Sequence, residues 1–154
     1  MAGHLALLLS ACRQAGKVCV DGREDEKIIT LIADGAMKAG NVVYNNAGTI
    51  AGTDDGAAEY FKGIQLPRYD TDCDTAPTAG VLVEVVLPQD AHRYNVATVD
   101  PGADKADGLG MVFGTTVGNM EIGGGDVVVF HPAKLSGAVA NTSRFVEIVW
   151  GGGA

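Results

Sequence analysis

The sequence predicts an all-β protein, a small glycine-rich β-barrel or sandwich with a short N-terminal amphipathic helix. Glycine accounts for 22 of the 154 residues, which is about twice its usual frequency of roughly 7%. The glycines separate short runs of Val and Ile, a pattern typical of short strands joined by tight turns and bulges. The chain length fits one domain, or one domain made of two small lobes.

The N-terminal stretch HLALLLSACRQ has two interpretations. Leu9–Cys12 fits the short box before a lipid-modified cysteine, but no Lys or Arg precedes the leucines as a secretory signal requires. Alternatively, four residues share one face of an α-helix because they lie at i, i+3, i+4 and i+7: Leu5, Leu8, Leu9 and Cys12. We expect residues 1–16 to form this helix, which either packs on its own domain or binds a partner as an arm.

A β-rich domain is expected over residues 17–150, followed by a flexible tail at 151–154. KIITLIA (27–33) has apolar residues on both faces and should therefore lie inside a sheet. Other expected strands lie in KVCV, VVY, GTI, AAEYFKGIQLP, VLVEVVLP, HRYNVATVD, MVF, GNMEIGGGDVVVFHP (two strands) and RFVEIVW. The stretch AKLSGAVANTS (133–143) is expected to be a loop.

The net charge of −8 argues against a nucleic-acid partner, because phosphate binding needs clustered Lys and Arg, and the eleven here are dispersed. No apolar run reaches the length of a membrane span, so no membrane partner is expected. The cysteines are odd in number and lack the spacing of a metal site: Cys12, Cys19 and Cys73. At most one disulfide is possible, and a buried free thiol is expected for Cys12, which lies on the apolar face of the predicted helix.

The sequence offers no strong catalytic constellation, so no enzyme and no cofactor are expected. No serine lies in the Gly-x-Ser-x-Gly turn of a hydrolase. The histidines lack metal-ligand spacing: His4, His92 and His131.

One acidic loop, DTDCD, is a candidate Ca²⁺ site through three carboxylates at alternate positions: Asp70, Asp72 and Asp74. An EF-hand is excluded because Thr75 replaces the glycine and Val81 replaces the final glutamate. An irregular calcium site, or a carbohydrate site with Tyr69 and Trp150 as stacking platforms, stays an alternative, although packing of Trp150 is favoured. A second acidic loop, DPGADKADG, is the weaker candidate, and a solvated turn explains either loop.

Between residues 32 and 88 an ordered series of features resembles the head decoration, or capsid cement, proteins of tailed phages. The features are KAGNVVY, a Gly-Thr-Ile strand, the step FKGI, and TAG before a valine-rich strand. A looser echo, GLGMVF, IGGGDVVVFHP and SRFVEIVW, covers the C-terminal part. The leading helix and the longer second half depart from the family pattern.

This resemblance implies a non-enzymatic virion protein, made in the host cytoplasm, that binds the outer surface of an icosahedral head. The implied partners are the major capsid protein and further copies of the chain, as a homotrimer. Non-covalent packing and exchange of strands or arms would stabilise the shell. The nearest alternative is another self-assembling structural subunit, of a fibre, tail or filament.

Overall fold

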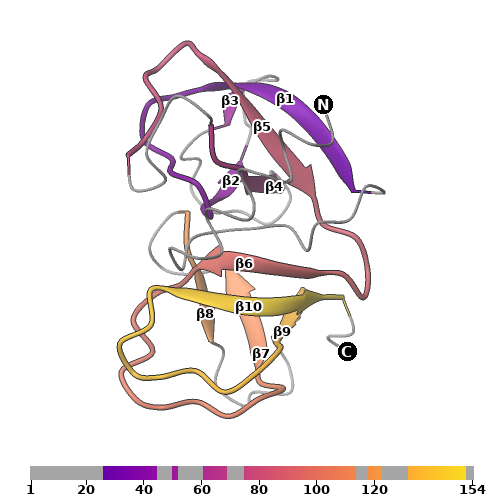
Figure 1. Cartoon of the computed structure of the whole chain (residues 1–154), viewed down its shortest axis with the longest axis vertical. Helices are drawn as coiled ribbons and strands as arrows, with labels where there is room; N and C mark the ends of the chain where they lie inside the picture. Colours follow the sequence, from indigo (N-terminus) through magenta and orange to yellow (C-terminus); the bar gives the residue numbers. More distant parts are fainter. Residues whose placement is uncertain are drawn as a thin grey trace.

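The computed structural model describes residues 26–44, 50–51, 61–68, 75–113, 118–122 and 132–151. Every regular element in this part of the chain is a β-strand, and ten strands form two five-stranded sheets (Figure 1). The all-β prediction is therefore confirmed. The helix expected at 1–16, the strand KVCV and the tail at 152–154 lie outside the described residues.

The first sheet is built from the N-terminal half of the chain, in the order β2-β4-β5-β1-β3. Its strands are β1 (Lys27–Ala33), β2 (Val42–Tyr44), β3 (Ile50–Ala51), β4 (Phe61–Gln65) and β5 (Leu82–Leu87). All neighbours are antiparallel except β1 and β3, which run parallel. β1 is paired on both sides, as its two apolar faces predict.

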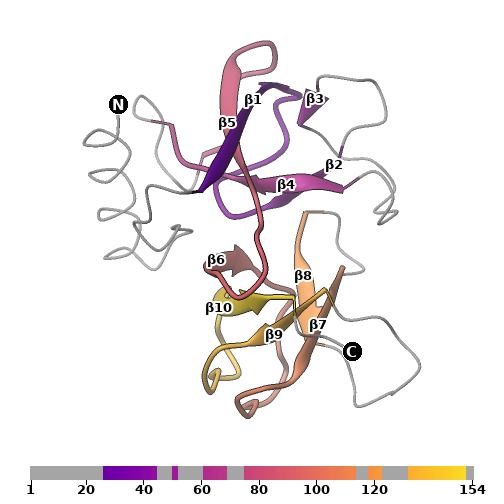
Figure 2. The same ribbon diagram turned by 90° about the vertical axis from the view of Figure 1, so that its right-hand side faces the viewer.

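The second sheet contains the C-terminal half, in the order β6-β10-β9-β7-β8, with all pairs antiparallel. Its strands are β6 (Arg93–Ala97), β7 (Gly110–Phe113), β8 (Met120–Ile122), β9 (Ala133–Leu135) and β10 (Phe145–Trp150). The two sheets follow one another along the long axis of the molecule, and Figure 2 shows the same separation from the side. The chain is thus a pair of lobes.

The prediction of a loop at 133–143 was wrong at its start, where β9 lies between β10 and β7. Ala133 and Leu135 are buried and Lys134 between them is only partly covered. This alternation is the half-buried strand pattern. It spans only three residues, so pairing on both sides, rather than local propensity, specifies it.

A shared apolar core joins the sheets. It takes buried side chains from the first sheet and from the second, and six of them are among the largest fully buried ones: Ile64, Leu66, Tyr94, Met111, Met120 and Ile148. Full burial of one such side chain stabilises the fold by about 1.5–3 kcal/mol. This core therefore holds the lobes together.

A smaller core lies on the opposite face of the first sheet, where β5 contributes Val83 and Val85 and β1 contributes Leu31. Val86 of β5 and Ile28 of β1 lie on the other face of these strands and contact the shared core. Alternate residues of both strands thus enter different cores, which explains why these strands are apolar on both faces.

Gly63 in β4 permits an unusually close approach between strands. Its φ is +154°, and a Cβ there would lie 2.3 Å from the Val86 carbonyl oxygen and 2.5 Å from Val85 Cγ1. Real Cβ atoms essentially never approach other atoms within 3.0 Å. Only glycine fits between β4 and β5 at this point.

Candidate functional site

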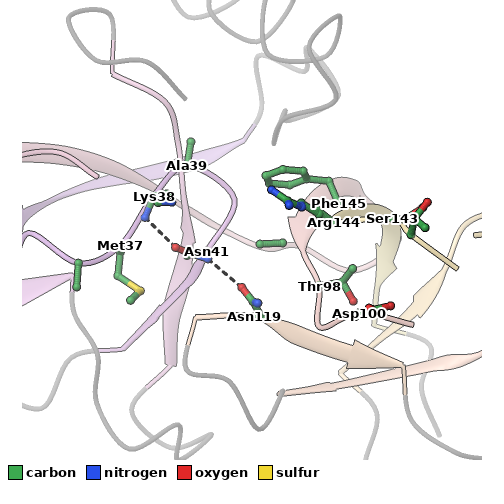
Figure 3. A pocket seen from close by; sticks show the side chains of 13 residues that line it. Met37, Lys38, Ala39, Asn41, Thr98, Asp100, Asn119, Ser143, Arg144 and Phe145 are labelled. Atoms are coloured by element: carbon green, nitrogen blue, oxygen red, sulfur yellow. Dashed lines mark hydrogen bonds between the residues drawn. The ribbon is translucent and has the colours of Figure 1, made fainter. Parts of the chain in front are cut away.

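A groove of about 640 Å³ lies at the junction of the two sheets (Figure 3). One wall is the loop that leads into β2, including Met37 and Asn41. The other wall combines the end of β6 with residues 142–145 at the start of β10. Asn119, just before β8, also lines it. The volume falls within the range of roughly 300–1,000 Å³ typical of small-molecule sites.

Asn41 connects the two walls. Its Nδ2 donates to the carbonyl of Gly118 at 3.0 Å and to Oδ1 of Asn119 at 3.1 Å. Its Oδ1 accepts from the backbone N–H of Lys38 at 2.8 Å. A single half-buried amide therefore fixes the loop of the first sheet against the second, as the dashed lines in Figure 3 show.

Backbone hydrogen bonds reinforce the same junction. The N–H of Val42 donates to the Gly118 carbonyl at 2.9 Å, and the N–H of Ala97 donates to the Gly40 carbonyl at 2.9 Å. Buried backbone groups that pair across the lobes leave little freedom for the lobes to move apart. The groove is a preformed feature of the fold.

Three charged side chains line the groove and keep hydrogen-bonding capacity that no described residue uses. The ammonium of Lys38 and the guanidinium of Arg144 have no hydrogen-bond or ion-pair partner in the described part of the chain, and both residues are exposed. Asp100 uses Oδ1 to accept from the Gly102 N–H at 2.9 Å. Its other carboxylate oxygen has no partner among the described residues. These three groups are available to a ligand.

A second polar cluster ties the start of β1 to the connection between β5 and β6. The Glu26 carboxylate, with its side chain only 1% exposed, lies 2.5 Å from His92 Nδ1. The Tyr94 hydroxyl donates to Glu26 Oε2 at 2.7 Å and accepts from the Gln89 N–H at 3.0 Å. Each of these four residues makes a hydrogen bond to another residue of the cluster, which indicates a structural role. We call the cluster of Glu26, Gln89, His92 and Tyr94 the latch.

The candidate site residues taken from the sequence fall almost entirely outside the described residues. This holds for the proposed arm (Leu5, Leu8, Leu9 and Cys12), for the calcium loop (Asp70, Asp72 and Asp74), and for His4 and His131. Trp150 is partly buried and packs against the shared core, which is the packing role favoured for it from the sequence. Within the described ranges, no group of three or more His, Cys, Asp or Glu side chains is placed to hold a metal.

No helix in the described segments has the length and apolarity needed to cross a bilayer.

Two large apolar side chains are exposed next to each other at one end of the first sheet. Leu82 is 58% and Ile32 is 37% exposed, and they are direct partners in the β1–β5 ladder. We call this pair the Ile32–Leu82 patch. Single exposed apolar residues are common on soluble proteins, but two cross-strand neighbours form a small continuous contact surface.

Comparison with known proteins gives a likeness in structure and none in sequence. No protein-family model matches the chain, and no curated protein matches it in sequence. The chain resembles the crystal structure of the head fiber gp8.5 N base of bacteriophage phi29, with a TM-score of 0.46 and 15% identity. This match covers 82% of the present chain and 94% of the other.

Proposed function

We propose that the protein is a structural subunit of a tailed-phage particle, and specifically a head decoration protein. It binds the outer surface of the capsid shell through the major capsid protein, as a homotrimer, and catalyses no reaction. It needs no cofactor, and its place is the virion surface after synthesis in the host cytoplasm.

The observation that carries the proposal is the place of the decoration-protein features in the fold. The features quoted from residues 32 to 88 overlap β2, β3, β4 and β5, which are four of the five strands of the first sheet. The sheet also has its own small core. The closer part of the resemblance therefore falls within one sheet, which supports a fold shared with the decoration proteins, whereas the looser GLGMVF and SRFVEIVW matches overlap β7 and β10 of the second sheet.

The glycine of the FKGI step gives that correspondence a physical reason. Gly63 lies where β4 and β5 approach so closely that a side chain would overlap the Val86 carbonyl. The motif therefore contains a residue that the sheet geometry requires, and not only residues that are common in strands.

The Ile32–Leu82 patch is the contact surface we assign to the shell. Covering a mostly exposed leucine and its neighbour contributes about 1–3 kcal/mol per copy before association costs. A trimer that engages three such contacts gains further through avidity. The edge strands β2 and β3 have only three and two residues, so side-chain packing is favoured here over strand exchange.

Co-sedimentation with empty capsids of the encoding virus tests the proposal. Wild-type protein should sediment with the shells, and Leu82→Ser should bind at least several-fold more weakly. Ala138→Ser is the matched control, because Ala138 is exposed on the other lobe. Failure of the wild-type protein to bind shells, with binding to fibres or tails instead, would assign the chain to another structural subunit of the particle.

A further inference from the structure

We propose that the groove between the two sheets binds an acidic saccharide, such as an oligosaccharide of uronic acids. This inference goes beyond shell binding and uses a different surface, because the Ile32–Leu82 patch does not line the groove. Three features of the groove support this ligand: a rigid cleft, a set of hydrogen-bonding side chains, and local positive charge.

The cleft is formed before any ligand arrives. Asn41 and two backbone hydrogen bonds hold its walls together across the lobes. Its volume of about 640 Å³ is large enough for two or three sugar rings. Preorganisation lowers the entropy cost of binding, which matters for a hydrophilic ligand that is well solvated in water.

The lining suits a ligand rich in hydroxyl groups. Thr142 and Ser143 bring hydroxyls, and Asn119 brings an amide whose oxygen already accepts from Asn41. The Asn119 Nδ2 has no partner among the described residues and can donate two hydrogen bonds. Phe145 also lines the groove and is partly buried, so it adds an aromatic, largely apolar side chain to the lining.

The charges select an acidic sugar over a neutral one. Among the described residues that line the groove, Lys38 and Arg144 are accompanied by one carboxylate, Asp100, in a chain whose net charge is −8. Figure 3 shows Arg144 beside Phe145 at one rim and Lys38 on the opposite wall. Guanidinium groups bind carboxylates through two parallel charged hydrogen bonds, so Arg144 is the anchor for a uronate.

Titration calorimetry of the full chain with trigalacturonic acid, maltotriose and inorganic phosphate tests the inference. We expect saturable binding of trigalacturonic acid, at least tenfold weaker binding of maltotriose, and weaker binding still of phosphate. Arg144→Gln should weaken trigalacturonic acid binding about tenfold, the usual effect of losing a charged hydrogen bond. Asp100→Asn should strengthen it roughly threefold, because it removes a like charge.

Arg93→Gln is the matched control. Arg93 is an exposed arginine of β6 that does not line the groove, so this variant should bind like wild type. Asp100→Asn keeps the oxygen that accepts from Gly102 and should fold normally. The inference is overturned by an absence of heat with trigalacturonic acid, by equal affinity for maltotriose or phosphate, or by equal losses in Arg93→Gln and Arg144→Gln. None of these results bears on shell binding.

Discussion

Replacing Gly63 with alanine should destabilise the protein more than any other single glycine-to-alanine change in the described segments. The new Cβ would lie 2.3 Å from the Val86 carbonyl oxygen, and tolerable contacts begin near 3.0 Å. β4 and β5 must therefore move apart by at least 0.7 Å, the difference between 3.0 and 2.3 Å. The Ile64–Val86 pair lies directly beside this point. Because both side chains belong to the shared core, the packing of that core would be disturbed.

The magnitude follows from two costs. Overpacking in a well-packed interior costs about 1–3 kcal/mol, and an alanine at positive φ costs a further 1–3 kcal/mol or so. We expect a loss of about 3 kcal/mol or more, a large part of the roughly 5–15 kcal/mol that stabilises a typical domain. For a chain of this size the melting temperature should fall by about 6–12 °C.

Alanine substitutions at two further glycines distinguish the steric cost from the cost of placing alanine at positive φ. Gly80 has φ +93°, and no atom lies within 4 Å of the position that a Cβ would take there, so Gly80→Ala reports the backbone cost alone, about 1–3 kcal/mol. Gly137 has neither constraint, and Gly137→Ala should be neutral or stabilise by up to about 1 kcal/mol. Urea unfolding at constant m-value measures all three. A Gly63→Ala variant no less stable than Gly80→Ala would refute the close-approach argument.

Three further substitutions test the latch, the junction and the patch. Tyr94→Phe should cost about 1–3 kcal/mol of unfolding free energy, since it leaves the buried Glu26 carboxylate one donor short; a change below about 0.5 kcal/mol would contradict the latch. Asn41→Ala should cost a similar amount in urea unfolding because it breaks the bond to Gly118, and unchanged stability would show that the junction does not depend on it. Leu82→Ser should leave stability within about 0.5 kcal/mol, and a larger loss would place this side chain in the core.

The strands could be predicted from the sequence where both periodicity and length were favourable. β1, β5 and β10 carry Val and Ile over six or seven residues, and their bounds match the expected ones closely. β9 was missed because three residues, Ala133–Leu135, are too few for a period to be visible. Its identity comes from the neighbours that it pairs with, and those lie elsewhere in the chain.

The groove could not be predicted, because its walls come from segments far apart in the sequence. Asn41 and Asn119 are 78 positions apart, and each alone is typical of a turn residue. The latch could not be predicted for the same reason, because Glu26 and His92 are separated by 66 positions in the sequence. Only the packing of one lobe on the other brings these groups together.

Electron cryo-microscopy of the native phage particle tests the central proposal most directly. We expect density for the two-lobed chain on the outside of the head, arranged as trimers, with the end of the first sheet that carries Leu82 against the major capsid protein. Density for the chain only at the tail, or no copy of it on the particle, would contradict the account.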